Sequence, residues 1–166
     1  MTTDEAPDWL QRATGLLEVE HPSVKACDPV NAPMIRHWKE ALGFPMDWQA
    51  PDEAPAAMLQ PWIFPGPTRA RPPGSADSDA TAVLELFAEG GYSGVVTVSA
   101  DMDFVRPLVP GDTLAYTSAL ESIGEDKKTG LGVGRFLGFR YTVRDAAEQV
   151  VGVIRFTNLV YRPQPA

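Results

Sequence analysis

The sequence predicts a single α+β domain, residues 1–166, in which helices come first and an antiparallel sheet follows. Two observations carry this prediction. Twelve of the 16 prolines lie before residue 74 and only four lie after residue 100, and proline is poorly tolerated inside sheets. From Tyr92 onward, apolar and polar residues alternate with the period of a strand. The predicted order is therefore helices, then strands long enough to curl around one of the helices.

The first 27 residues predict a short helix and an extended lead-in. Between residues 6 and 17 the apolar residues recur at helical spacing, with Asp8 as a candidate cap. Residues 18–24 favour an extended segment that ends at Pro22 and the turn at 27–29.

The clearest helix is expected over residues 31–43. Asn31 can cap it, Pro33 suits its first turn, and Gly43 suits the position just past its end. Its apolar stripe comprises Met34, Ile35, Trp38, Ala41 and Leu42. His37 lies beside the stripe, and we interpret it as structural because no partner for acid–base chemistry is implied nearby.

Residues 54–64 form the most concentrated apolar segment of the first half. Its apolar residues could share one helical face, yet Pro61 removes a backbone hydrogen bond, so we expect a short or kinked helix. Loops flank it at 44–53 and 65–78, and the second is rich in Pro, Gly and Ser and is expected to be flexible. A further helix follows at 80–89, capped by Asp79 and stopped by Gly90 and Gly91.

Four strands are expected, over 92–104, 113–123, 131–144 and 149–161, with a polar hairpin at 124–128. The first should be half exposed, with Val96, Val98, Ala100, Met102 and Phe104 on its apolar face. The third carries Gly132, Gly134 and Gly138 on one face. Because bare glycine weakens a strand, we expect a helix or a ligand to pack against that face.

Composition narrows the function classes. A net charge of −8 argues against nucleic acid as a partner, and no apolar run is long enough to span a membrane. The N-terminus has no secretory signal pattern. A single cysteine, Cys27, and two distant histidines, His21 and His37, predict no disulfide and no metal site. The default location is the cytoplasm.

Few residues indicate catalytic chemistry. The sequence has no phosphate loop, nucleophile elbow or zinc-helix motif. Asp101 and Asp103 share a strand face, and cross-strand pairing with Arg135, Arg140 or Arg155 explains them better than acid–base work. Lys127 and Lys128 could attract an anionic cofactor, although hairpin lysines are usually only solvated.

Five segments together resemble the MaoC-like dehydratases, which have the hot-dog fold. They are residues 28–38, 54–60, 91–96, the Arg106-Pro107-Leu108-Val109-Pro110-Gly111-Asp112 turn, and 127–129. The likeness is strongest to the MaoC-like domain of actinobacterial steroid side-chain enoyl-CoA hydratases. It implies a sheet curled around a short or broken central helix, a CoA thioester as substrate, no bound cofactor, and a second MaoC-like subunit as partner.

The catalytic motif of the family is missing at its expected place. Active members carry Asp-x-Asn-Pro-x-His after the helix that ends here at Gly43, whereas this sequence reads Gly-Phe-Pro-Met-Asp-Trp-Gln-Ala-Pro over 43–51. Asp47 is the only carboxylate there and has no histidine beside it. The resemblance therefore implies no catalytic residue in this chain, and a partner that supplies the Asp and His.

We therefore expect the non-catalytic subunit of a heteromeric enoyl-CoA hydratase for bulky, steroid-derived acyl groups. The expected acyl-binding residues are Met58, Leu59, Trp62, Ile63 and Phe64, for which plain core packing is the alternative; Lys127 and Lys128 are the expected CoA-facing residues. Two other functions stay open. One is an acyl-CoA thioesterase that uses Asp47 or Asp101. The other is an acyl-binding or scaffolding module for an aldolase or a lipid-transfer protein. In the steroid proteins a zinc-ribbon and OB-type domain often follows, and the linker-like residues 162–166 are consistent with a chain cut before it.

Overall fold

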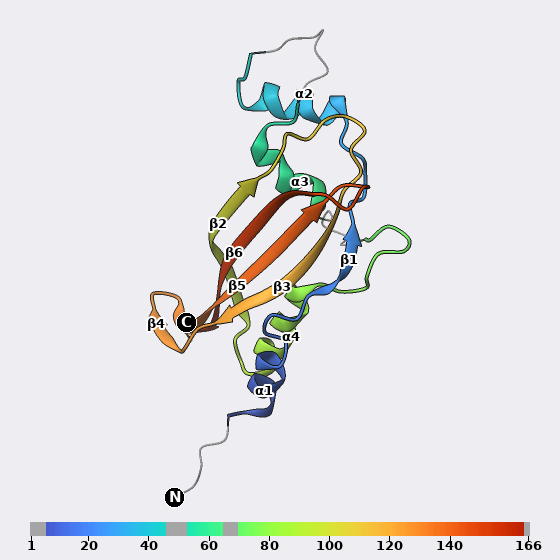
Figure 1. Cartoon of the computed structure of the whole chain (residues 1–166). Helices are drawn as coiled ribbons and strands as arrows, with labels where there is room; N and C mark the ends of the chain where they lie inside the picture. The colour runs from blue at the N-terminus through green and yellow to red at the C-terminus, as the bar shows by residue number, and fades with distance from the viewer. Residues whose placement is uncertain (1–5, 46–52, 65–69, 165–166) are drawn as a thin grey trace, which may run out of the picture.

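The computed structural model describes residues 6–45, 53–64 and 70–164 (Figure 1). Its helical elements are α1 (Asp8–Thr14), α2 (Ala32–Ala41), the 3-10 turn η1 (Ala56–Met58), α3 (Leu59–Ile63), the 3-10 turn η2 (Ala80–Ala82) and α4 (Val83–Glu89). Its strands are β1 (His21–Lys25), β2 (Gly94–Phe104), β3 (Ala115–Ile123), β4 (Lys127–Thr129), β5 (Gly132–Arg144) and β6 (Val150–Pro163). The predicted α+β order is confirmed.

The strands form one antiparallel sheet in the order β1-β3-β5-β6-β2, with the short β4 paired to β5. One face, here called the inner face, carries α3 near the end of β2 and α4, with α1 packed on it, near the opposite end (Figure 1). The core lies between the inner face and these helices. From β5 it takes Leu137, Phe139, Tyr141 and Val143, which alternate along the strand.

The helices predicted from capping residues form where those capping residues lie. The Asn31 side chain accepts a hydrogen bond from the N–H of Met34 at 3.0 Å, and Asp79 accepts one from the N–H of Thr81 at 2.9 Å. Gly43, just past α2, has a φ of +71°, a conformation that favours glycine. Asp8 was wrongly predicted as a cap: Pro7 holds that position, and Asp8 forms an ion pair with Arg12 one turn later.

The segment with Pro61 is a short helix, as predicted. It starts as the 3-10 turn η1, continues as the single α-turn of α3, and ends at Phe64, whose backbone is extended. Pro61 cannot donate the hydrogen bond that would join it to the preceding turn, so a long regular helix is not possible here. The described part of the 65–78 loop, from Ala70, is hydrogen-bonded to β1. The Ala76 N–H donates to Ser23 O at 3.0 Å, and the Lys25 N–H donates to Ser75 Oγ at 3.1 Å.

Three expectations about the strands need correction, and a fourth, on the glycines of β5, follows. Pro22 does not end the first extended segment but lies inside β1, which tolerates it because β1 is an edge strand. Lys127 and Lys128 of the predicted polar hairpin belong to β4, which continues to Thr129. The predicted apolar face of β2 is largely exposed, with Val98 at 49% and Phe104 at 45%, because β2 is the other edge and no described helix covers it.

Among the described residues, the glycines of β5 are covered by neighbouring strands and not by a helix. A Cβ at Gly138 would lie 2.5 Å from the Ser122 Oγ on β3, and one at Gly134 would lie 2.8 Å from Leu159 Cδ1 on β6. The expected helix is therefore not found on that face in the described residues, and the expected ligand stays a prediction. The side chains of the adjacent strands lean over the bare positions instead.

Candidate binding groove

A groove of about 310 Å³ lies beside the short helix. One wall comprises Glu53, Ala54, Pro55, Ala56 and Leu59, and the other comprises residues 104–108 and Val151. The Ala54 N–H donates to Leu108 O at 2.7 Å, which joins the two walls at the base. The volume is at the lower limit of small-molecule sites, so a bulky ligand needs additional space.

The groove continues into an apolar strip along the inner face, here called the inner strip: Ala100, Met102 and Phe104 on β2, with Ile154 and Phe156 on β6. Directly opposed residues of two strands share a face, and β2 pairs Ala100 with Phe156 and Met102 with Ile154. Because the β2 side of this strip is not covered, it is open to a ligand or a partner. The strip ends at an aromatic cluster, in which the ring centroid of Phe64 is 5.5 Å from Tyr141 and 5.7 Å from Phe156.

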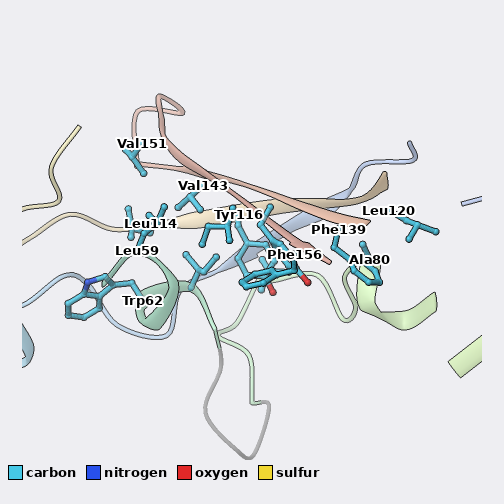
Figure 2. Close-up of a cluster of buried hydrophobic side chains, with 14 of the residues drawn as sticks. Leu59, Trp62, Ala80, Leu114, Tyr116, Leu120, Phe139, Val143, Val151 and Phe156 are labelled. Carbon is cyan, nitrogen blue, oxygen red and sulfur yellow. The ribbon is translucent and has the colours of Figure 1, made fainter. Parts of the chain in front are cut away.

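Figure 2 shows how the two helical segments divide the inner face. Leu59 and Trp62 of α3 lie to one side and Ala80 of η2 to the other, with Tyr116 and Phe156 between them. A longer central helix would cover this middle region. Among the described residues, side chains and no helix lie over it, which is a consequence of the early end of the helix at Phe64.

The predicted acyl-binding residues fall into two groups. Leu59 lines the groove, and Phe64 packs on the aromatic cluster. Met58, Trp62 and Ile63 are buried in the core. The indole N–H of Trp62 is buried and has no hydrogen-bond partner among the described residues. The role of these five residues in substrate binding stays a prediction.

Lys127 and Lys128 do not lie at the groove. Lys127 is paired with Gly134 at the start of β5, whereas the groove lies near Val143, opposite Gly152. The stretch of β5 from Gly134 to Val143 corresponds to about 30 Å of strand, and Figure 1 shows β4 and α3 at opposite ends of the sheet. The Lys127 Nζ lies 5.6 Å from the centre of the Phe136 ring.

The ionisable groups of the groove form no acid–base pair among the described lining residues. Arg106 is held by two carboxylates, with Nη1 at 2.7 Å from Asp112 Oδ2 and Nη2 at 2.9 Å from Asp145 Oδ2. These hydrogen bonds raise the pKa of Arg106 above its ordinary value, so it is a fixed cation. Glu53 is the only carboxylate of the lining, and His21 and His37 lie elsewhere, on β1 and on the exposed side of α2.

The remaining candidate acids are not placed for chemistry in the groove. Asp101 and Asp103 lie on the outer face of β2, and Asp103 pairs with Arg155 at 3.0 Å, which confirms the cross-strand interpretation for that residue. Asp47 lies outside the described residues. The described part of the chain has no cluster of three or more His, Cys, Asp or Glu side chains that could hold a metal ion. Its helices are also too short and too polar to cross a membrane.

Sequence reasoning missed the groove itself, although its parts were visible. The wall formed by 104–108 belongs to the Pro-Gly-Asp turn, and the register of the isolated bridge between Ala54 and Leu108 brings it to the short helix. Pairing across about fifty residues cannot be read from local periodicity.

Comparison with known proteins gives a consistent result. Residues 19–153 match the family model described as "FAS1-like, dehydratase domain region". A probable enoyl-CoA hydratase alpha subunit from Thermomonospora curvata is 38% identical over 148 residues, which cover 82% of this chain and 46% of the relative. The 3-oxo-4,17-pregnadiene-20-carboxyl-CoA hydratase alpha subunit of Mycobacterium tuberculosis is 29% identical, over 93% of this chain and 52% of the relative. The chain thus spans about half the length of these curated relatives.

A solved structure is similar over nearly the whole chain. It is the ChsH1-ChsH2 complex from Mycobacterium tuberculosis, with a TM-score of 0.75, 25% sequence identity, and coverage of 96% of this chain and 94% of that one.

Proposed function

Because this chain belongs to the FAS1-like dehydratase-region family and has the MaoC-like hot-dog fold, we propose that it is a subunit of a heteromeric enoyl-CoA hydratase for bulky acyl groups. In this proposal it forms the binding surface for the acyl group and is itself non-catalytic. The single observation that carries the proposal is the open groove and inner strip left by the short helix. The hydratase names of its relatives support the reaction class.

The acyl group is proposed to lie from the groove along the inner strip. Leu59 and Phe64 are the predicted residues that border this path, and Phe104 and Phe156 form its floor. From Gly152 to Phe156 the path follows about 13 Å of strand, which suits a rigid multi-ring group. The 3-oxo-pregnadiene substrate in the name of one relative supports a steroid side-chain thioester as the substrate class.

A partner is proposed to supply the catalytic Asp and His. Hydration of an enoyl thioester needs a base to activate water and an acid to deliver a proton. The described lining residues of the groove offer one exposed carboxylate and a fixed arginine, and no histidine. The missing Asp-x-Asn-Pro-x-His motif supports the same division of labour.

The edge of β2 is the proposed contact for that partner. It is an unpaired edge of eleven residues, Gly94–Phe104, and Val95, Val96 and Val98 on it are exposed. A long apolar edge of this kind is a template for pairing with another strand. A second hot-dog chain that pairs there would extend the sheet and cover the open side of the inner strip. The complex named for the similar solved structure supports this choice of partner.

The test is reconstitution. The chain is purified alone and together with a MaoC-like protein that carries the Asp-x-Asn-Pro-x-His motif, and hydration of a steroid 2-enoyl-CoA is measured. We expect activity only from the pair, and its loss when the partner's Asp or His is replaced. Hydration by this chain alone would contradict the non-catalytic role. A stable pair whose turnover does not depend on this chain would favour a scaffolding module, for example for an aldolase or a lipid-transfer protein.

A further inference from the structure

A polar cluster is buried on the inner face between α3 and α4. Asp79 Oδ2 accepts hydrogen bonds from the Tyr116 hydroxyl at 2.9 Å and from Arg71 Nη2 at 3.0 Å. Asp79 Oδ1 accepts from the N–H of Thr81 at 2.9 Å and from the Thr81 hydroxyl. Arg71 Nη1 also donates to the Tyr116 hydroxyl at 3.3 Å. The carboxylate and its three side-chain donors, Tyr116, Arg71 and Thr81, therefore find their partners within the cluster.

Tyr141 adjoins this cluster without joining its hydrogen bonds. Its ring centroid is 5.5 Å from that of Tyr116, and the residue is only 2% exposed. No described residue forms a hydrogen bond with its hydroxyl. The hydroxyl is not among the fully enclosed polar atoms of the described residues that lack a partner, so it keeps a small accessible surface through which a ligand oxygen can reach it. Burial first, and the negative charge of Asp79 second, raise the pKa of Tyr141 above its ordinary value, so the phenol keeps its proton.

Tyr141 places its hydroxyl, which donates to no described residue, near the end of the proposed acyl path. Its ring lies on β5 directly beside β6, with centroids 5.6 Å from Phe156, the residue at which the inner strip ends. Phe64 covers the same ring at 5.5 Å. Phe64 follows the last residue of α3, and it is only partly buried, so its side chain can turn aside more easily than those held on the strands.

We propose that the Tyr141 hydroxyl is a specificity-determining donor for an oxygen, a ring carbonyl or ring hydroxyl, at the far end of a polycyclic acyl group. This inference rests on the proposed function, because it takes the acyl group to lie along the inner strip. In the cluster of Arg71, Asp79 and Tyr116 the Tyr116 phenol donates to Asp79, whereas the adjoining Tyr141 phenol donates to no described residue.

The experiment compares two ligands and two phenol deletions. The ligands are steroid 20-carboxyl-CoA thioesters with a saturated side chain, which cannot be hydrated, one with a ring ketone and one with a methylene in its place. Their dissociation constants are measured for the reconstituted complex and for this chain alone. The variants are Tyr141→Phe and, as the matched control, Tyr161→Phe, whose phenol lies over Gly94 on β2.

We expect the wild type to bind the ketone more tightly than the methylene analogue by about three- to tenfold, the worth of one neutral hydrogen bond. Tyr141→Phe should abolish that ratio without weakening the methylene analogue, and Tyr161→Phe should keep it. Equal affinities in the wild type, or an unchanged ratio in Tyr141→Phe, would overturn the inference. Thermal unfolding of each variant separates a binding effect from a folding defect.

The failure of the two proposals can be told apart. If the complex hydrates steroid enoyl-CoA but the ketone ratio is absent, only the role of Tyr141 is wrong. If neither steroid analogue binds to the complex or to the chain alone, the proposed substrate class is wrong, and the proposed role of Tyr141 is wrong as well.

Discussion

Leu59 rests directly on Gly152. A Cβ placed at Gly152 would come within 2.5 Å of Leu59 Cδ2 and 3.0 Å of the Asp103 carbonyl oxygen. The glycine on β6 is therefore the point at which the short helix reaches the sheet. Since Leu59 also lines the groove, this one contact sets both the position of α3 and the width of the site.

The first prediction concerns that contact. Gly152→Ala should destabilise the fold by about 1–3 kcal/mol, because an extra methyl group in a packed core forces backbone or rotamer shifts. Gly130→Ala is the control, since a Cβ there meets nothing within 4 Å. Urea unfolding of both variants measures the difference. Equal stabilities would show that α3 is not seated on Gly152.

The second prediction concerns the pH dependence of stability. Burial alone would raise the pKa of Asp79, but hydrogen bonds from Thr81, Arg71 and Tyr116 outweigh it and hold the pKa below its ordinary value. A carboxylate with a lowered pKa stabilises the fold above its unfolded pKa, and that stabilisation is lost as the pH falls through its folded pKa. Unfolding free energy should therefore fall with acidification below about pH 4.

Substitution isolates the contribution of Asp79. Asp79→Asn keeps an oxygen that can cap η2 but removes the charge beside Arg71, and we expect a loss of about 3 kcal/mol near neutral pH. The loss should shrink in acid, where the wild-type carboxylate is itself protonated. Asp103→Asn, at an exposed ion pair, should cost no more than about 0.5 kcal/mol. A pH-independent difference between wild type and Asp79→Asn would contradict the charge-based account.

Local signals in the sequence were sufficient to predict α2, the short α3 and the η2–α4 helix. Asn31 and Asp79 are caps whose acceptor oxygens act on the nearest N–H groups, and Pro61 acts on its own turn, so each effect is contained within a few residues. The family resemblance correctly gave the curled sheet around a short helix. It also named Leu59, which lines the groove; the role of Leu59 in substrate binding stays a prediction.

What the sequence could not give depends on pairings between distant segments. The alternation in β2 predicted a half-buried strand, but burial depends on which strands and helices lie beside it, and β2 is an edge. The hydrogen-bonded cluster of Arg71, Asp79 and Tyr116 joins a loop, a helix cap and a strand, and no spacing rule connects them. The CoA-facing role of Lys127 and Lys128 stays a prediction, and their distance from the groove gives it no support.

The third prediction tests the β2 edge. Val98→Lys should weaken binding of the MaoC-like partner by at least about tenfold, because a charge in a newly buried strand pair is costly. It should leave the stability of the isolated chain within about 0.5 kcal/mol, since Val98 is exposed there. Val19→Lys, at an exposed valine off the β2 edge, is the control. Partner affinity from titration calorimetry decides the question, and unaltered affinity in Val98→Lys would place the interface elsewhere.

The fourth prediction uses two neighbouring alanines of the 3-10 turn η1. Ala56 and Ala57 are both exposed, but only Ala56 lines the groove. Ala56→Phe should fill part of the 310 Å³ groove without entering the core. In the reconstituted complex we expect it to lower kcat/KM for a steroid enoyl-CoA about tenfold, a cost of about 1.4 kcal/mol. A short-chain enoyl-CoA, which does not need the filled space, should be affected much less. Ala57→Phe adds the same ring one position along and should behave like the wild type with both substrates. If the two variants lower kcat/KM equally, the effect lies in η1 itself and the groove does not hold the acyl group.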